Sequence, residues 1–407
     1  MQQPPTANGA TTYHRVLSAL ILALLPLGFG TTVNFADKQF PIPLFVAPTT
    51  LLVISLVTRQ LMSDQHPPPD RDSWARTYVI CAVLLFIPIL ISASVLSALA
   101  AWANFILGAV SGVLAGSIWW QSERSRFGLV DVGLLVLIVQ IGLQVLEIVR
   151  SGLGTMNLSP YSYSTVIHNT ATEWGGSNYI AGCLVVACFL SLARLTQCPK
   201  ENAAVKTIVI LVDAAGIALS ILTFSRGAVI ASAVAGMLFL FVRAKSVWSK
   251  ALALILAPVL SVTAVFLISS ITVLRFGTDV MTLNGRDAIW HDAWISFLHH
   301  PVLGTGWVSL RVSLSAASFA HNLVLSFLQI GGLLGVVFLS TVLARVLSMI
   351  RYQSVFLGAL AAGLAISMTD SFVEGAVGGT LFAIALTMGR QSIAADDARC
   401  DHLEIFG

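Results

Sequence analysis

Long apolar runs, separated by short polar or charged stretches, recur along the whole chain. A helix needs about 20 mainly apolar residues to cross the hydrocarbon core of a bilayer. The pattern predicts twelve spans, near residues 15–30, 40–58, 77–93, 97–120, 129–149, 177–196, 206–223, 228–242, 251–270, 321–342, 353–369 and 377–389. We therefore expect an all-α, polytopic membrane protein with about 12 transmembrane helices.

The composition supports this expectation. Of 407 residues, 57% are apolar and only 10% are charged, whereas about 25% of the residues in a soluble domain are charged. A soluble enzyme is therefore excluded. The net charge of +3 is too small to indicate a nucleic-acid partner.

The positions of the cations predict the orientation of the chain. With the N-terminus in the cytoplasm, sixteen of the 22 Lys and Arg residues fall on the cytoplasmic side and six fall outside. Cytoplasmic loops carry an excess of Lys and Arg, so both termini are expected in the cytoplasm. The six outside cations are Lys38, Arg150, Arg226, Arg275, Arg286 and Arg311. The five cysteines fall within spans or on the cytoplasmic side, so no disulfide framework is expected.

Two outside loops are long, at residues 150–176 and 271–320. Loops of this length are usually functional or disordered, and the second is rich in aromatic residues. Its segment 286–299 fits an amphipathic helix with Trp290, Trp294 and Arg286 on one face. A face rich in Trp is typical of the lipid headgroup region, so we expect this face toward the membrane. The simpler alternative is a surface anchor without a chemical role.

His321 opens the tenth predicted span. On a continuous helix, Gly332 and Gly335 lie within about 40° of His321 in direction, and about 16 and 21 Å deeper in the membrane. Small residues there allow another helix to approach closely. This arrangement places His321 at the outer interface on a closely packed helix. A polar helix cap, followed by ordinary glycine packing, is an equally good interpretation.

Charged side chains on the outer side form a candidate cluster around His321. Arg226 lies in a short hairpin between the seventh and eighth spans, while Arg286 and Arg311 precede His321 in the long loop. Guanidinium groups bind phosphate through two parallel hydrogen bonds, although an outer arginine also commonly reaches to lipid phosphate. Asp370 and Glu374, at the outer ends of the last two spans, are placed to orient His321 or to bind a sugar hydroxyl.

Two other groups of polar residues suggest different sites. Asp287, His291, His299 and His300 resemble metal ligands in type, but no second carboxylate or HExxH-type spacing accompanies them, so no metal is expected. Asp131 and Asp213 within predicted spans suggest an ion or proton path. Because both lie near cytoplasmic helix ends, snorkelling or pairing with a neighbouring cation is the simpler account.

Arginines at a bilayer surface beside a histidine suit group transfer from a lipid phosphate. A histidine with a pKa near 6.5 removes a proton from a sugar hydroxyl only as the transition state develops. Arginines stabilise the negative charge on a departing diphosphate. This chemistry requires no cofactor.

Three motifs resemble the O-antigen ligase family. His321-Asn322, followed after nine residues by Gly332-Leu333-Leu334-Gly335, is similar to its histidine motif. Ser225-Arg226-Gly227 resembles the start of its shared domain, and Gly285–Gly306 is similar to its segment with an Arg, a Trp and a closing hPhhGhG pattern. The resemblance covers about residues 206–390.

The resemblance implies a GT-C-like glycosyltransferase of the bacterial inner membrane. Such an enzyme moves O-antigen from undecaprenyl diphosphate to a sugar of lipid A–core, on the periplasmic side and without a metal. It implies that His321 is the general base and that Arg226 and Arg286 bind the donor diphosphate. Possible further binding or orienting residues, chosen here by location, are Arg311, Arg150, Asp370, Glu374 and Asn322.

The expected domains are helices one to six over residues 1–205, an O-antigen ligase-like domain over 206–390 with the periplasmic loop 271–320, and a cytoplasmic tail over 391–407. O-antigen or exopolysaccharide polymerases share this domain and donor and remain an alternative. Oligosaccharyltransferases of the family usually add a large soluble domain, whereas only eighteen residues follow Gly389 here. A lipid-linked glycan transporter is less favoured, because no internal repeat or midplane charge cluster was found.

Overall fold

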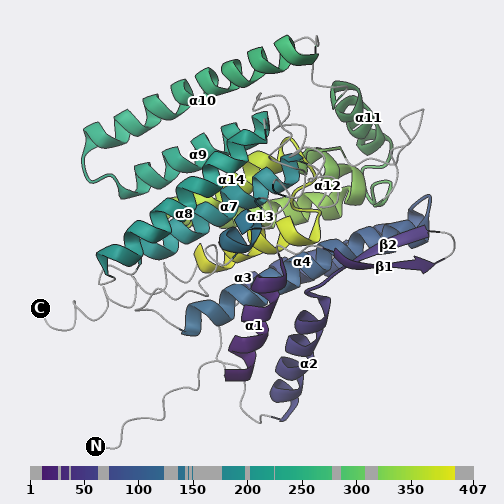
Figure 1. Cartoon of the computed structure of the whole chain (residues 1–407). Coiled ribbons are helices and arrows are strands. Elements are labelled where there is room, and N and C mark those ends of the chain that lie inside the picture. Colours follow the sequence, from purple (N-terminus) through teal and green to yellow (C-terminus); the bar gives the residue numbers. More distant parts are fainter. Residues whose placement is uncertain are drawn as a thin grey trace, which may run out of the picture.

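The structure, a computed structural model, describes most of the helical part of the chain. It covers residues 12–25, 29–35, 38–62, 73–122, 136–142, 145, 149, 177–197, 202–223, 225–276, 286–307 and 320–389. Six of its helices are long and apolar enough to cross a membrane, and five more apolar helices are shorter. The protein is therefore a polytopic, helical membrane protein (Figure 1).

The elements follow the order of the chain. They are α1 (Thr12–Leu24), β1 (Phe29–Phe35), β2 (Lys38–Pro43), α2 (Val46–Met62), α3 (Ser73–Leu84), the 3-10 helix η2 (Ile87–Ile91), α4 (Val95–Ser122), α7 (Ser177–Thr196), α8 (Ala203–Leu222), α9 (Arg226–Arg243), α10 (Val247–Phe276), α11 (Arg286–His299), α12 (Leu323–Gly331), α13 (Leu333–Arg351) and α14 (Leu357–Ser367). A further helix, Ala376–Gly389, follows α14.

The centre of the bundle consists of α7, α14 and the helix Ala376–Gly389, whose side chains are mostly buried. A stripe of glycines lets α4 pack directly on this last helix. A methyl group at Gly108 would lie 2.8 Å from the Ala376 carbonyl, and one at Gly116 would lie 3.0 Å from the Thr387 side chain. Small residues spaced by four allow such close helix contacts in membranes.

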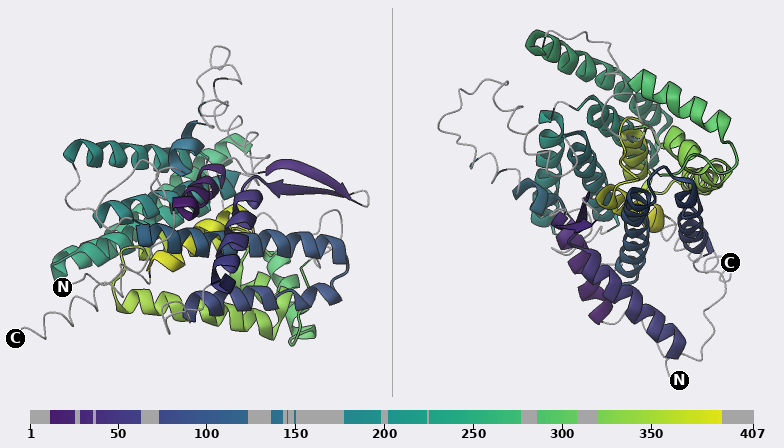
Figure 2. Two further views of the ribbon diagram at one scale, coloured as in Figure 1. Left: turned by 90° about the horizontal axis from the view of Figure 1, so that it is seen from below. Right: turned by 90° about the vertical axis from the view of Figure 1, so that its right-hand side faces the viewer.

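Helices α8, α9 and α10 lie toward the outside of this centre, and α10 packs against α9 (Figures 1 and 2). Many apolar side chains of α10 are exposed, among them Val262 at 70% and Phe266 at 67%. Exposed apolar surface on this scale suits contact with lipid chains rather than with water.

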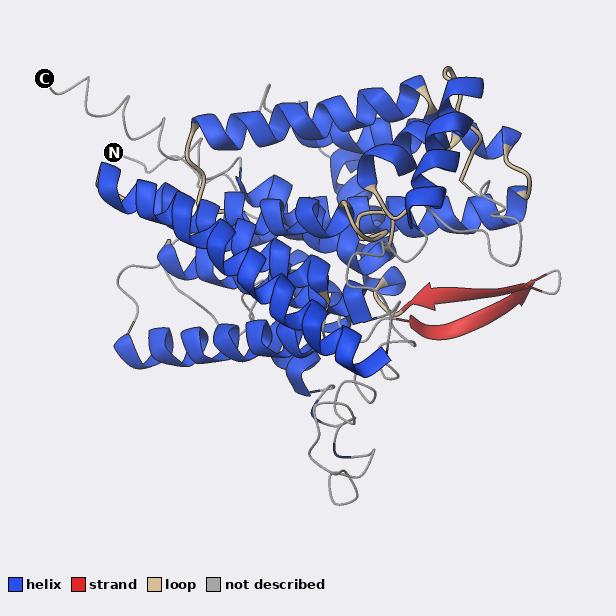
Figure 3. Ribbon diagram, turned by 90° about the horizontal axis from the view of Figure 1, so that it is seen from above, coloured by secondary structure: helices blue, strands red, loops and turns tan. Residues whose placement is uncertain are grey.

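One antiparallel hairpin is an exception to the predicted all-α fold. Strands β1 and β2 pair over Phe29–Phe35 and Lys38–Pro43 and project from the helices (Figure 3). The predicted span 40–58 is therefore wrong at its start, because α2 begins only at Val46. Alternating Thr, Val and Phe residues in β1 suit a strand. The span predicted at 129–149 lies mostly outside the described residues.

The tenth predicted span is also wrong as a continuous helix. The helix stops at Gly331, Gly332 turns with φ +53°, and a second helix starts at Leu333. His321 itself precedes α12 and is not helical. The predicted face joining His321 to the two glycines therefore does not exist. An apolar run does not reveal such a break, because glycine alone permits this backbone conformation without strain.

After the break, α13 turns back against α12. A methyl group at Gly335 would overlap the Phe327 carbonyl. The ring centroids of Phe327 and Phe338 lie 4.5 Å apart. Gly335 thus allows a close approach between helices, as the sequence suggested, but the helix that approaches is α12, directly before the break. The two glycines therefore fix the angle between α12 and α13.

Residues 300–307 hold the end of α12 in place. The backbone amides of Thr305 and Gly306 donate to the carbonyls of Gln329 and Ile330, at 2.7 and 3.1 Å. These carbonyls lie at the C-terminus of α12, where helical partners are missing. The buried Trp307 indole donates to the Leu85 carbonyl at 2.7 Å and so connects this segment to the residue that follows α3.

Helix α11 has the predicted bounds, but only part of the face predicted to meet the membrane is exposed. Ala293 is fully buried and packs with Ile289, Ala320 and Leu325, while the Trp290 indole nitrogen is also buried. The part of this face around Ala293 therefore packs against the start of α12. Trp294 is 44% exposed and remains available to the surface.

Asp213 also departs from expectation. It lies in the middle of α8 and is only 3% exposed, and neither carboxylate oxygen has a hydrogen-bond partner in the described part of the chain. The predicted pairing with a cation near a helix end is thus not found there. Asp131 lies outside the described residues.

The packing at Gly335 gives a stability prediction. In G335A the added methyl group would push α12 and α13 apart, and overpacking of this kind costs about 1–3 kcal/mol. We expect a lower melting temperature in detergent. The matched control is G236A in α9, where the nearest atom to an added methyl is 3.8 Å away, and it should be neutral. Equal melting temperatures for G335A and the wild type would contradict the described break.

Candidate functional site

The loop between α14 and the last helix, residues 368–375, is the meeting point of three helix starts. It touches the start of α12 through His321 and Asn322, and the start of α9 through Gly227. It also packs on the start of α7, where the Tyr179 ring lies 5.6 Å from the Phe372 ring. Polar residues from distant parts of the sequence are therefore gathered at one end of the bundle.

The backbone at His321 is held in an uncommon conformation. His321 has φ +50°, which a residue with a side chain rarely adopts. The next residue, Asn322, caps α12: its side-chain oxygen accepts from the amides of Val324 and Leu325 at 3.1 and 3.2 Å. This cap starts the helix directly after His321 and so fixes the position of His321 relative to α12.

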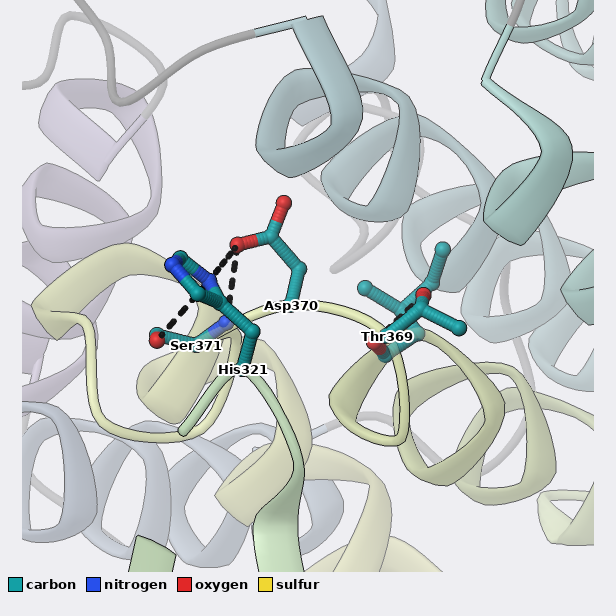
Figure 4. Close-up of polar contacts among 5 residues, drawn as sticks. His321, Thr369, Asp370 and Ser371 are labelled. Atoms are coloured by element: carbon teal, nitrogen blue, oxygen red, sulfur yellow. Dashed lines mark hydrogen bonds and ion pairs between the residues drawn. The ribbon is translucent and has the colours of Figure 1, made fainter. Parts of the chain in front are cut away.

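His321 points toward Asp370 (Figure 4). Its Nδ1 lies 3.3 Å from Asp370 Oδ1, and the Ser371 hydroxyl lies 3.5 Å from the same nitrogen. The Ser371 amide donates to Asp370 Oδ1 at 2.8 Å and holds the carboxylate in place. If Nδ1 carries the proton and donates to Asp370, Nε2 is left with a free lone pair that can accept a proton. With its side chain 34% exposed, His321 is accessible from outside the bundle.

Arg226 is brought to the same end of the bundle as the first residue of α9. Ser225 caps this helix by accepting from the Ala228 amide at 3.2 Å. A methyl group at Gly227 would lie 2.5 Å from the Thr369 hydroxyl, directly before Asp370 in the loop. The absence of a side chain at Gly227 therefore allows α9 to start against the loop that holds His321. A helix start also favours bound anions.

Arg286 is the first residue of α11, which runs alongside α12 in the same direction. Ile289 packs near Ala320 and Leu325 at the start of α12, whereas residues after α11 bond to Gln329 and Ile330 at its end. The start of α11 therefore lies toward the His321 end of α12. The described contacts of His321 itself are with Asp370 and Ser371 rather than with an arginine.

Glu374 is placed in the same loop, facing inward. It is 4% exposed, so its carboxyl group is shielded from water. Burial raises the pKa of Glu374 from 4.5 to about 7, while its own backbone amide, the Ser326 hydroxyl and His321 act in the opposite direction. Glu374 is therefore a group whose charge changes near neutral pH.

Other site predictions have different outcomes. Arg150 and Arg311 lie outside the described residues. In the part of the chain that is described, no three His, Cys, Asp or Glu side chains are grouped to hold a metal ion. Ser371 and Thr369, which contact His321 and Gly227, were not predicted. Their position beside Asp370 is the only signal in the sequence that indicates them.

The cap of α12 gives a prediction. N322A removes the oxygen that satisfies two helix amides, and loss of such a cap costs about 1 kcal/mol. We expect a lower melting temperature for N322A than for the wild type. N322S retains an oxygen acceptor and should lose less than half as much. Equal losses in both variants would mean that capping is not the function of this side chain.

Part of the chain matches a known protein family. The family model described as O-antigen ligase matches residues 211–340. The matched region contains Arg226, Arg286, Asn322 and His321, whereas Asp370 and Glu374 lie beyond it. No curated protein gives a significant match to the chain. The motifs and this match agree, so residues 211–340 of the chain are similar to the O-antigen ligase family domain.

Proposed function

We propose that this protein is an O-antigen ligase of the bacterial inner membrane. It transfers a glycan from undecaprenyl diphosphate to a sugar hydroxyl of lipid A–core on the periplasmic side. The single observation that carries the proposal is the contact of His321 with Asp370. This contact lies beside the start of α9, which bears Arg226. His321 and Arg226 lie within the matched family domain, and Asp370 lies after it. The transfer requires no metal or other cofactor.

His321 is the general base in this proposal. Its Nε2 accepts the proton of the acceptor hydroxyl while that oxygen attacks the anomeric carbon of the donor sugar. The bond from this carbon to the diphosphate oxygen breaks, and undecaprenyl diphosphate leaves with the electron pair. Attack from the side opposite the leaving group inverts the anomeric configuration. Asp370 stabilises the imidazolium that forms and orients the ring through Nδ1.

Arg226 and Arg286 bind the donor diphosphate. Each is the first residue of a helix, and each helix starts toward the end of the bundle where His321 lies. A guanidinium group stays charged and presents two parallel N–H donors to phosphate oxygens. The positive ends of α9 and α11 add to this attraction. These groups stabilise the negative charge that grows on the diphosphate as it leaves.

The membrane arrangement follows from the same proposal. The His321 end of the bundle faces the periplasm, both termini lie in the cytoplasm, and about twelve segments cross the membrane in a GT-C-like fold. Six helices of sufficient length and the excess of Lys and Arg on the opposite side support this arrangement. The lipid-linked donor then reaches the site within the outer leaflet.

The assignment of His321 is tested by H321A in purified, reconstituted protein. A general base contributes roughly 10²- to 10⁴-fold to a rate, so we expect joining to fall at least about 100-fold. The fold and the insertion should be unchanged. H291A, which removes an exposed histidine of α11, should retain the wild-type rate. A wild-type rate in H321A would exclude His321 as the base.

The role of Arg226 is tested by R226K. Lysine keeps the charge but loses the two parallel donors, so the affinity for the lipid-linked donor should fall by roughly tenfold or more. Donor binding is measured by titration in nanodiscs. The matched control is R243K at the other end of the same helix, which should bind the donor as the wild type does. Unchanged affinity in R226K would remove Arg226 from the diphosphate site.

A further inference from the structure

The last helix, Ala376–Gly389, begins after a glycine that cannot cap it. Its first helical hydrogen bond runs from the Gly379 amide to the Gly375 carbonyl at 2.8 Å, so Gly375 is the N-cap residue. Ser, Thr, Asp and Asn are preferred at this position, because their side-chain oxygen accepts from a backbone amide two or three residues later. Gly375 has no side-chain oxygen, so the amides of the first turn need an acceptor from elsewhere.

Tyr179, near the start of α7, supplies this acceptor. The Gly378 amide, three residues after Gly375, donates to the Tyr179 hydroxyl at 2.6 Å. A methyl group at Gly375 would lie 2.5 Å from the same hydroxyl oxygen and about as close to the ring, at 2.9 Å. The Tyr179 hydroxyl therefore occupies the place where an N-cap side chain would put its oxygen. The cap comes from a residue 199 positions before Gly378 in the chain.

Tyr179 also contacts the loop that precedes this helix. Its ring packs against the ring of the buried Phe372, with centroids 5.6 Å apart. Gly182, about one turn later on α7, leaves room for this packing, since a methyl group there would lie 3.1 Å from the Phe372 ring. The helix α7 thus holds both the loop and the helix start that ends it.

A short series of contacts leads from Phe372 to His321. The Phe372 amide donates to the Asp370 carbonyl at 2.9 Å. The Asp370 side chain accepts from the Ser371 amide at 2.8 Å and lies 3.3 Å from His321 Nδ1. The position of the Asp370 carboxylate therefore depends on the conformation of this loop, which Tyr179 contacts at Phe372 and at Gly378.

We propose that Tyr179 is a positioning residue for the transfer reaction: its hydroxyl caps the last helix and so fixes the loop in which Asp370 holds His321. This inference deepens the proposed function and rests on it. Tyr179 acts through the loop, since its hydroxyl bonds to the Gly378 amide. It precedes the matched region 211–340, whereas Asp370 follows it. The residues that build the site therefore extend beyond the family domain on both sides.

The first test measures hydrogen exchange of residues 372–379 by mass spectrometry, in full-length protein in nanodiscs without substrate. Y179F keeps the ring and removes the hydroxyl. Loss of a helix cap changes a local equilibrium roughly fivefold, so exchange of this segment should rise about fivefold. The matched control is Y78F, which removes a buried hydroxyl of α3 that has no hydrogen-bond partner among the described residues. It should leave the segment unchanged, and unchanged exchange in Y179F would overturn the proposal.

The second test asks whether Tyr179 acts through Asp370. A displacement of about 1 Å can cost about 100-fold in rate, so we expect joining at saturating substrates to fall at least about fivefold in Y179F and not in Y78F. In a D370N background, Y179F should change the rate less than about twofold, because residues that act through one another are not additive. Equal losses in both backgrounds, or no loss in either, would contradict the proposal.

A further pair of variants tests the cap if Y179F does not fold. Y179A removes the ring that blocks a side chain at position 375. In Y179A/G375S the serine supplies an N-cap oxygen of its own, whereas Y179A/G375A adds only a methyl group. Exchange of residues 376–379 should be about fivefold slower with the serine. Equal exchange in the two would overturn the capping role.

The two kinds of measurement separate this inference from the proposed function. Hydrogen exchange needs no substrate, so it tests the cap even where the wild-type protein joins no glycan. Absence of joining in the wild type, with faster exchange in Y179F, would count against the proposed function alone. Joining by the wild type, with unchanged exchange in Y179F, would count against Tyr179 alone.

Discussion

The site depends on the short helix α12 and on the two turns that bound it. His321 before the helix and Gly332 after it both have positive φ angles, of +50° and +53°. Between them, nine residues form a helix too short to cross a membrane. The Asn322 cap fixes one end, and hydrogen bonds from Thr305 and Gly306 fix the other. This fixed helix holds His321 against the loop of Asp370.

Charged side chains lie at two helix starts and in one loop toward the His321 end of the bundle. Only 10% of the residues are charged, yet Arg226 begins α9, Arg286 begins α11, and Asp370 and Glu374 lie in one loop. Each helix start adds a partial positive charge to its arginine. The balance between these cations and two carboxylates suits a site that binds an anionic donor and passes a proton to a histidine.

Much of this arrangement could be predicted from the sequence, for identifiable reasons. Apolar runs locate helices because the bilayer fixes their length, and the spacing in residues 286–299 predicted α11 with its correct bounds. The family motifs selected His321, Arg226 and Arg286. The sequence indicates Asp370 only through its expected position on the same side as His321, and its Oδ1 lies 3.3 Å from His321 Nδ1.

Other features depend on contacts between distant residues and left no pattern in the sequence. The break at Gly332 is stabilised by residues 300–307, so the apolar run 321–342 alone predicted one straight helix. The apolar face of α11 was directed to lipid in the prediction because Ala320 and Leu325, which cover it, lie far along the chain. The burial of Asp213 in α8 likewise results from packing against α7.

The most direct test of the account is the reaction itself, measured with purified protein in nanodiscs. The protein is given a glycan on undecaprenyl diphosphate together with lipid A–core, and the products are separated and weighed by mass spectrometry. We expect a product in which the glycan is joined to lipid A–core, with undecaprenyl diphosphate released. Extension of the donor glycan without transfer to lipid A–core, or movement of the donor across the membrane without joining, would contradict it.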